Sequence, residues 1–577
     1  MTNMTLKIWL TITVLVILVS SQTFSQNRYK DINFAAPMKI PLVLAGNFAE
    51  LRSNHFHTGL DIKTNNREGY KLYAIEDGYI ARINVSHWGY GLCIYVQHPN
   101  GFTSVYAHCK KFTPEVEAFV RKAQRKKEKE TITLYPGAEQ FPVKRGEVIG
   151  FSGNSGSSVA PHLHFEIRDT KTEEPINPLL FGFDVKDDIP PIIKGIKIYS
   201  LNGANVNGKN ADLLCAAIKN SQGYHIKTKS PIVIHGEVGI AINTIDKLNE
   251  APNKCGIYSI ELYDGDTLIF QQKLEKLNFY TNRYINTYMD YLQYRYRKES
   301  YHKSFLAVNN KLEIYGQIRN KGILKFEKNE VKKMKYIVSD VYGNKSELYF
   351  DLKGETSLKK RSPLNHNPIQ FNASKKNELV RKEFKAYLPQ GALYDDASIQ
   401  FQEYPARHNT ISAVFNFNTD SVPIHKYYIL KLKLSGVKPA HQNKLVIAEL
   451  SKNMNRLSSK GGTMKDGWVT SKVRSFGNYA IAIDTVKPKI TPLNLENKKY
   501  KIAREIRFKI SDNLSGIDTY NVKIDGNWFH AFYNPKTNLL RVPFNQYNKI
   551  DSGKHKLVTT ITDERKNTAV FKANIEL

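Results

Sequence analysis

The sequence predicts a mainly β protein built from several modules. Short stretches alternate apolar and polar residues, as strands with one buried face do, and Asn-Gly or Asp-Gly turns separate them, for example Asn100-Gly101, Asp264-Gly265 and Asp525-Gly526. The 577 residues correspond to about three to five domains. Hydrophobic residues make up 41% of the chain, which is enough for sizeable cores and excludes wholesale disorder.

The net charge of +30 predicts a surface that attracts anionic partners. Nucleic acid, acidic membrane surfaces and carboxylate- or phosphate-rich wall polymers all belong to this class. The lysines are spread along the chain rather than gathered in one block. This favours a general attraction to polyanions over a nucleic-acid site, and we therefore predict no nucleic-acid partner.

Residues 1–25 have the pattern of a secretory signal peptide. Lys7 supplies the positive charge, 8–19 form an apolar run, and Thr23-Phe24-Ser25 is a small-x-small cleavage pattern before Gln26. The alternative is an uncleaved anchor, but the run is short for a span of about 20 residues. No later segment is apolar for long enough to cross a bilayer. We expect export to the periplasm or cell envelope, with no transmembrane span in the mature chain.

The four cysteines are too few for a disulfide scaffold in a chain of this length. Cys215 and Cys255 could form a bridge within one β module, or could both be buried free thiols. Cys93 and Cys109 lack the CxxC spacing of a structural zinc site.

The first domain is expected over residues 27–186. Residues 70–85 alternate as a strand, and 92–96 and 102–107 flank Pro99-Asn100-Gly101 as a hairpin. The second hairpin strand ends at His108. A histidine is thereby delivered to a strand end, where a site can be built on a rigid base.

A helical insertion is predicted at about 113–130. Thr113 can cap it, and Pro114 suits the first helical position. Acidic residues lie early and basic residues late, which matches the helix dipole. We interpret the basic end as a solvated face.

The stretch Pro161-His162-Leu163-His164-Phe165-Glu166 places two histidines two residues apart, so that on a strand both project from one face. Earlier in the chain, His57 and Asp61 stand four residues apart. Three nitrogen or oxygen ligands with a fourth position left for water form a catalytic zinc site. His57, Asp61 and one histidine of the pair would supply the ligands. The other histidine and His108 would move protons and hold the oxyanion.

Taken together, these residues resemble the lysostaphin/LytM-type zinc metallopeptidases, a family of peptidoglycan endopeptidases, over about residues 40–180. The matching segments are Asn54–Ile62, Gly89–Gly91, Tyr106–His108, Gly146–Gly153 and Pro161–Arg168.

The resemblance implies an open antiparallel β-sheet with a groove above it. It implies zinc ligation by His57, Asp61 and His164, a general base at His162, and a transition-state-stabilising histidine at His108. Because helix 113–130 departs from the compact family pattern, we expect it to wall or cover the groove. Glu166 would support His164 or serve a structural role, and His55 would lie beside the site or on the surface.

Beyond the linker Asp187–Pro191 the chain contains a repeat. Pro191 and Pro488 each follow an aspartate, and Asp340-Val341-Tyr342-Gly343-Asn344 recurs as Asp563-Glu564-Arg565-Lys566-Asn567. We predict β-sandwich modules at 190–354 and 487–577 that loosely resemble immunoglobulin-like domains.

A different β-rich unit is predicted at 365–483. Tyr284, Tyr288 and Tyr291 have helical spacing, and a helix packed on the sandwich is favoured over a stacking surface for nucleic acid or sugar. The region after residue 187 would serve spacing, wall attachment or the binding of other envelope proteins.

The leading hypothesis is an exported zinc endopeptidase that cuts the peptide stems or cross-links of peptidoglycan. The first alternative is a non-catalytic envelope protein of the same fold that activates another wall hydrolase. The second is a protease acting on Gly-rich proteins.

Overall fold

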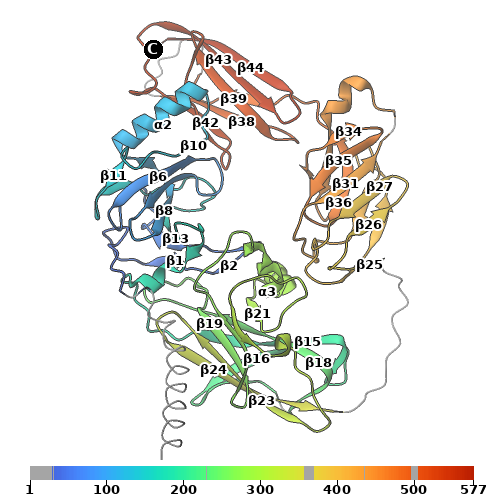
Figure 1. Ribbon diagram of the computed structural model, residues 1–577. Coiled ribbons are helices and arrows are strands. Elements are labelled where there is room, and N and C mark those ends of the chain that lie inside the picture. Colours follow the sequence, from blue (N-terminus) through green and yellow to red (C-terminus); the bar gives the residue numbers. More distant parts are fainter. Residues whose placement is uncertain are drawn as a thin grey trace, which may run out of the picture.

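A computed structural model describes residues 29, 31–228, 230–355, 369–434, 436–495 and 505–576. The predicted signal peptide lies outside these residues. The described chain is mainly β and forms four units arranged in a ring (Figure 1). Within the described residues, no helix is long and apolar enough to span a membrane.

The N-terminal unit contains an antiparallel sheet with the order β1-β4-β13-β8-β7-β6-β10, together with a smaller sheet, β5-β12-β9. The strands are β1 (Leu44–Gly46), β2 (Leu51–Arg52), β3 (His55–Phe56), β4 (Leu60–Lys63), β5 (Lys71–Tyr73), β6 (Gly78–Val85), β7 (Leu92–Gln97), β8 (Phe102–Cys109), β9 (Lys111–Phe112), β10 (Ile132–Leu134), β11 (Pro142–Val143), β12 (Val148–Phe151), β13 (His162–Asp169) and β14 (Pro175–Ile176). Strands β7 and β8 form the predicted hairpin across Asn100-Gly101. A short helix, η1 (Pro178–Phe181), follows the last strand.

The pleat of β13 separates the core of this unit from its candidate site. Leu163, Phe165 and Ile167 are fully buried in the hydrophobic core. Each such side chain stabilises the fold by about 1.5–3 kcal/mol relative to an exposed one. The intervening residues, from His162 to Arg168, project from the opposite face because side chains alternate along a strand. The apolar positions therefore fix which face carries the histidines.

Helix α2 (Pro114–Lys127) confirms the predicted insertion, with Val116 and Val120 buried. Thr113 has the extended backbone of an N-cap residue, but its side chain makes no capping hydrogen bond. The interpretation of the basic end as purely solvated is wrong. Arg121 Nη1 lies 3.1 Å from His530 Nδ1, which belongs to the C-terminal unit.

The second unit differs from the predicted two-sheet sandwich. Its strands pair continuously in the order β21-β18-β15-β16-β17-β24-β23-β19-β20-β22, and β18 also pairs with β24, so that one sheet wraps round on itself. The strands are β15 (Ile192–Val206), β16 (Leu213–Asn220), β17 (Gly223–Ile226), β18 (Ile232–Ile245), β19 (Ser259–Asp264), β20 (Thr267–Lys273), β21 (Tyr301–Lys303), β22 (Tyr315–Ile318), β23 (Val331–Ser339) and β24 (Lys345–Gly354).

The tyrosine-rich insertion of this unit forms short helices. They are η2 (Asn282–Tyr284), α3 (Ile285–Tyr288) and η3 (Gln293–Arg297), and a further turn, η4 (Asn320–Gly322), follows later. Tyr288 is buried, with its ring centroid 5.2 Å from that of Phe56 in the N-terminal unit. For Tyr288, the packed helix is therefore correct and the stacking surface is not. The buried Tyr288 ring joins the first and second units.

The third unit contains the sheets β26-β27-β31-β35-β34 and β29-β30-β36-β32-β33, with a small pair, β25-β28. Its elements are β25 (Ile369–Phe371), β26 (Asn377–Val380), β27 (Phe384–Leu388), β28 (Ala397–Ile399), β29 (Phe401–Tyr404), β30 (Val414–Phe417), β31 (Tyr428–Lys433), η5 (Pro439–Lys444), β32 (Leu445–Leu450), β33 (Leu457–Ser459), β34 (Thr463–Lys465), β35 (Trp468–Val473) and β36 (Gly477–Ile483).

The C-terminal unit consists of two facing sheets, β37-β38-β42-β41 and β40-β39-β43-β44, around one core. This is the two-sheet arrangement predicted for it. The strands are β37 (Lys489–Pro492), β38 (Glu505–Ser511), β39 (Ile517–Ile524), β40 (Asn527–Trp528), β41 (Phe532–Asn534), β42 (Leu539–Pro543), β43 (Lys554–Asp563) and β44 (Thr568–Glu576).

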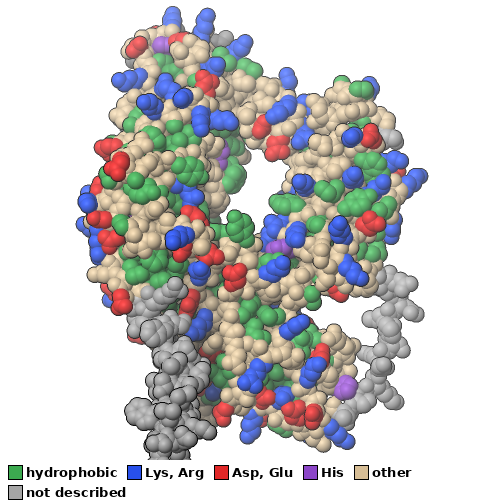
Figure 2. Space-filling view, viewed as in Figure 1, with side chains coloured by type: hydrophobic (Ala, Val, Ile, Leu, Met, Phe, Trp, Pro, Cys, Tyr) green, Lys and Arg blue, Asp and Glu red, His purple; other side chains and the backbone are tan. Residues whose placement is uncertain are grey.

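Contacts between neighbouring units close the ring around an open centre (Figure 2). At the joint between the first and last units, Glu130 Oε2 accepts hydrogen bonds from the backbone N–H of Tyr533, at 2.9 Å, and from the Tyr520 hydroxyl. It also lies 3.0 Å from His87 Nε2. One carboxylate therefore gathers donors from both units at this joint.

The four cysteines are free thiols. A bridge between Cys215 and Cys255, one of the two alternatives left open by the sequence, is therefore not formed.

We predict that Glu130→Ala loosens the joint between the first and last units. It would leave the Tyr533 N–H and the Tyr520 hydroxyl without their shared acceptor, at a cost of about 1–3 kcal/mol. Denaturant unfolding should show a lower midpoint, and X-ray scattering a larger radius of gyration. Glu139→Ala, which removes an exposed carboxylate of the same unit, is the matched control. Equal midpoints and radii for the two variants would contradict the prediction.

Candidate metal centre and active site

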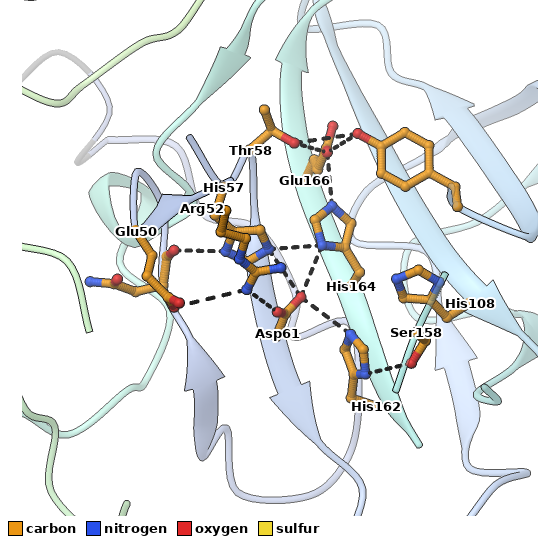
Figure 3. A network of polar contacts seen from close by, with 12 residues as sticks. Glu50, Arg52, His57, Thr58, Asp61, His108, Ser158, His162, His164 and Glu166 are labelled. Atoms are coloured by element: carbon orange, nitrogen blue, oxygen red, sulfur yellow. Dashed lines mark hydrogen bonds and ion pairs between the residues drawn. The ribbon is translucent and has the colours of Figure 1, made fainter. Parts of the chain in front are cut away.

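Strand register brings the predicted site residues together. Strand β13 pairs with β4, which places His164 opposite Asp61, and with β8, which places His164 opposite Ala107. His108 is the next residue on β8, and His162 lies two residues before His164 on the same face (Figure 3). Three adjacent strands therefore converge on one point.

His57, Asp61 and His164 form a compact triangle of ligand atoms. His57 Nε2 lies 3.0 Å from His164 Nδ1 and 3.0 Å from Asp61 Oδ1, and the third side, from Asp61 Oδ1 to His164 Nδ1, is 2.9 Å. All three residues are buried. Ligand atoms at about 2.0–2.1 Å from a tetrahedral ion lie about 3.3 Å apart, so the triangle has the dimensions of a metal site.

The second nitrogen of each ligand ring is held by an acceptor. His57 Nδ1 donates to the Asn47 carbonyl at 2.7 Å, and His164 Nε2 donates to Glu166 Oε1 at 2.8 Å. Each hydrogen bond fixes the ring tautomer so that the free nitrogen faces the triangle. Of the two roles foreseen for Glu166, the structure places it as the acceptor for His164.

Glu166 is fully buried, and both of its carboxylate oxygens accept hydrogen bonds. The hydroxyls of Thr58 and Tyr90 donate to its Oε1 at 2.5 and 2.6 Å, and Arg168 Nε donates to its Oε2 at 2.7 Å. Burial alone would raise the pKa of Glu166, but Arg168 and His164 outweigh it and hold this pKa well below its usual value. Glu166 is therefore a fixed anion behind His164.

Two members of the triangle, His57 and Asp61, have the charge states that a cation requires. Burial lowers the pKa of His57 to about 4, which keeps the ring neutral. Burial opposes ionisation of Asp61, but His57 and the hydrogen bonds from His162 and His164 keep its pKa well below the usual value. Arg52 Nη2 donates to Asp61 Oδ2 at 2.5 Å, which leaves Oδ1 facing the histidines. Burial would lower the pKa of His164, but its hydrogen bonds to Asp61 and Glu166 outweigh burial and raise this pKa to about 9, so His164 has to lose a proton when an ion binds.

His162 and His108 stand beside the triangle, with their ring centroids 4.9 Å apart. His162 Nδ1 lies 2.8 Å from the Ala160 carbonyl, and its Nε2 lies 3.3 Å from Asp61 Oδ1. His108 Nδ1 lies 2.9 Å from the Ser155 carbonyl. Burial, followed by the two neighbouring histidines, lowers the pKa of His108 to about 3. The pair is placed to exchange protons with a molecule bound at the triangle.

Two glycines let the loop at 152–158 pack against the segment that carries Tyr90. Gly156 has φ +69°, and a Cβ at this position would lie 2.3 Å from Gly89 O and from Gly91 N. This close approach lets the Tyr90 carbonyl accept the His108 N–H at 2.9 Å. Gly91, with φ +65°, is limited in the same way, because a Cβ there would lie 2.4 Å from Gly156 N; glycine at 91 and 156 is therefore required for placing His108.

The site opens into a cleft of about 1150 Å³ that three units share. Besides the five predicted site residues, its walls include Phe279, Tyr280, Asn282 and Arg283 of the second unit and His425 and Arg474 of the third. No residue of helix α2 lines it, so the expectation that this helix walls the groove is wrong. The helix packs against the C-terminal unit instead. His55, which is exposed, lies on the rim.

Sequence reasoning missed Arg52, Asn47 and the walls contributed by later units. Arg52 lies in the two-residue strand β2 and Asn47 directly follows β1, and neither residue belongs to a recognisable sequence spacing. The later wall residues are more than 100 positions away in the sequence from His57 and Asp61. No local pattern signals them, because only the ring arrangement brings them to the cleft.

Two family models match separate parts of the chain. Residues 55–133 match peptidase family M23, and 369–484 match the Zu5-like domain. The chain therefore carries an M23 peptidase domain near its N-terminus and a Zu5-like domain in the third unit. This confirms the resemblance to lysostaphin/LytM-type peptidases.

Curated relatives align with a limited part of the chain. DD-carboxypeptidase/endopeptidase Mpg of Neisseria meningitidis serogroup B and the protein of the same name in Neisseria gonorrhoeae are each 31% identical over 129 residues. Each alignment covers 22% of this chain and 23% of the relative, so the chain spans about a quarter of the relatives it matches.

Solved structures also align with part of the chain. The catalytic domain of lysostaphin from Staphylococcus simulans is 22% identical, covering 24% of this chain and 91% of that one, with a TM-score of 0.19. A zinc-containing peptidase from Vibrio cholerae is 20% identical, covering 26% and 41% respectively, with a TM-score of 0.18.

We predict that Glu166→Gln weakens divalent-metal binding about 10–100-fold, because the amide removes the anionic acceptor that orients His164. Competition with a chromogenic chelator measures the affinity. Glu173→Gln is the control, since Glu173 contacts the same Arg168 but does not touch the triangle. An unchanged affinity in Glu166→Gln, in protein whose circular dichroism is native, would show that the acceptor is not needed.

Proposed function

We propose that this protein is an exported zinc endopeptidase that hydrolyses peptide bonds of peptidoglycan. The observation that carries the proposal is the buried triangle of His57, Asp61 and His164, with His162 and His108 beside it and a cleft above. The M23 match over 55–133 supports the reaction class. The partial similarity to the Neisseria DD-carboxypeptidase/endopeptidases supports the wall substrate.

The donor set fits zinc. Two imidazole nitrogens and one carboxylate oxygen leave a fourth position for water, as in catalytic zinc sites. Bound zinc lowers the pKa of its water to about 7 and polarises the carbonyl under attack. The hydrogen bonds from His57 to Asn47 and from His164 to Glu166 orient the ligands.

The remaining histidines supply proton transfer and orientation. His162, on the same strand face as His164, is assigned as the general base that accepts a proton from the attacking water. His108, held by its hydrogen bond to the Ser155 carbonyl, is assigned to stabilise the developing oxyanion. Both lie in the lining of the cleft, where an extended peptide would pass.

The cleft favours a substrate with carboxylates. Arg283 and Arg474 contribute positive charge to the walls of the same cleft. The net charge of +30 adds a long-range attraction to anionic polymers. Peptidoglycan stem peptides carry free carboxylates and would be drawn to such a groove. The signal-peptide pattern at 1–25 supports export to the envelope.

The direct test is digestion of purified peptidoglycan by the zinc-loaded protein, with mass analysis of the released peptides. We expect release that stops when a chelator removes zinc and resumes when zinc is restored. His162→Ala and His108→Ala should each lower the rate about 10²–10⁴-fold, because each removes a positioned proton-transfer or oxyanion group. His408→Ala, which changes an exposed histidine of the third unit, is the control and should retain full activity.

A protein that binds zinc but releases no peptide under any condition would contradict the enzymatic proposal. In that case an activator of another wall hydrolase becomes the better explanation. Cleavage of Gly-rich proteins without cleavage of peptidoglycan would overturn the substrate assignment alone.

We predict that Arg474→Gln raises KM for soluble peptidoglycan fragments roughly fivefold and leaves kcat nearly unchanged. A partly exposed ion pair contributes up to about 1 kcal/mol, and its loss weakens ground-state and transition-state binding equally. Steady-state kinetics on isolated fragments measures both constants. Arg456→Gln, an exposed arginine of the same unit that lies outside the cleft lining, should change neither. An equal KM in the two variants would remove Arg474 from substrate binding.

A further inference from the structure

The repeat noted in the sequence gathers aspartates at two corresponding places, outside the candidate active site. We name these sets junction triad 1, formed by Asp187, Asp246 and Asp340, and junction triad 2, formed by Asp484, Asp512 and Asp563. In each triad, one side-chain oxygen from every member lies within 4.8 Å of the other two. Three carboxylates at this separation repel one another unless a positive charge stands between them.

The first member of each triad lies in a linker. Asp187 precedes the second unit and Asp484 precedes the C-terminal unit, and each stands four positions before a proline, Pro191 and Pro488 respectively. The second member follows the end of a strand in both units: Asp246 comes after β18 and Asp512 after β38.

The third member of each triad is held by a matching hydrogen-bond pattern. In triad 1, the side-chain amide of Asn344 donates to Asp340 Oδ2 at 2.7 Å and to the Asp187 carbonyl at 3.2 Å. In triad 2, the amide of Asn567 donates to Asp563 Oδ2 at 2.8 Å and to the Asp484 carbonyl at 2.9 Å. In both triads, therefore, an asparagine side-chain amide connects the third aspartate to the linker by the same pair of hydrogen bonds.

Each triad contains a fully buried carboxylate with an unpartnered oxygen. Asp246 is 1% exposed and Asp484 is 0% exposed, and among the described residues the Oδ1 atom of each has no hydrogen-bond partner. Asp187 Oδ2 and Asp512 Oδ1 are unpartnered as well. Burying a carboxylate without a partner costs several kcal/mol. Such atoms in both triads indicate that a ligand completes the arrangement.

The surroundings of triad 1 leave space for an ion. They provide little positive charge to balance the carboxylates. A cavity of about 10 Å³ borders Asp187 and Asp246, and this is about the size of one water-sized sphere. Burial, followed by the charges of Asp187 and Asp340, raises the pKa of Asp246 to about 8. Burial likewise raises the pKa of Asp187 to about 6.

We propose that each junction triad binds one calcium ion. Calcium takes carboxylate and carbonyl oxygens at about 2.3–2.6 Å, so two oxygens on the same ion lie at most about 5 Å apart, as they do in both triads. All the ligands are oxygen atoms, which disfavours zinc. Magnesium requires shorter, near-octahedral bonds and keeps several waters, for which these buried sites leave little room.

A bound ion would fix the direction of the chain at two joints. In triad 1 it would tie the linker that leaves the peptidase domain to two loops of the second unit. In triad 2 it would tie the linker that leaves the Zu5-like domain to two loops of the C-terminal unit. The sites are therefore structural and lie apart from the zinc centre, and the proposal stands independently of the proposed function.

The test uses the full mature chain with its zinc site loaded, titrated with calcium chloride in a calorimeter. We expect two calcium ions per chain and a rise of several degrees in Tm. Asp246→Asn and Asp512→Asn should each lose one ion, and the double variant should lose both. Asp518→Asn, an aspartate of the C-terminal unit that pairs with Lys566 outside both triads, should keep both ions.

A second measurement separates loss of an ion from simple misfolding. In calcium-free buffer, Asp246→Asn and Asp512→Asn should be at least as stable as the unmodified protein, because each replaces one of three neighbouring carboxyl groups with a neutral amide. With calcium, the order of Tm values should reverse. No calcium binding up to about 10 mM, well above the range of extracellular calcium modules, would overturn the proposal. Two ions remaining in the double variant would overturn the assignment to the triads, and equal stabilisation by magnesium would overturn the choice of calcium.

Discussion

The pairing register of β13 with β4 and β8 is the constraint on which the candidate site depends. One residue of slip would turn His162 and His164 into the core and expose Leu163 and Phe165. The hydrophobic face of β13 therefore stabilises the fold and aims the histidines at the same time. Glu166 and Arg168 continue the site face, so a single strand supplies a candidate metal ligand, the acceptor that holds its ring and the positive charge that keeps this acceptor ionised.

Local sequence patterns predicted the parts of the molecule that depend on neighbouring residues. Alternation and the Asn100-Gly101 turn predicted the β7–β8 hairpin, and the Thr113-Pro114 start predicted helix α2. The spacing of His57 with Asp61 and of His162 with His164, taken together with the family resemblance, predicted which residues meet at the site. Two features escaped prediction because no sequence spacing specifies them: the ion pair of Arg52 with Asp61, which lie nine residues apart, and the cleft walls from later units.

In the later units too, neighbouring residues predicted the strands, but they did not predict which distant strands pair. Turn residues and strand alternation predicted that they are β-rich, and the C-terminal unit has the expected pair of sheets. In the second unit, the pairing of β18 with β24 joins the strands into one wrapped sheet. Short-range patterns do not specify which edge strands meet. The basic end of α2 was misjudged for a related reason, since the surface that covers it comes from more than 400 residues later in the chain, at His530.

The ring has one joint that differs from the others in kind. The peptide chain itself crosses three of the joints, whereas only non-covalent contacts hold α2 and Glu130 against the C-terminal unit. Separation at this joint leaves the two partners tethered, so that they meet again at a high effective concentration. The joint combines polar contacts with the packing of His87 against Tyr520 and Tyr533, and it extends to the loop whose Ser158 carbonyl accepts a hydrogen bond from Lys536.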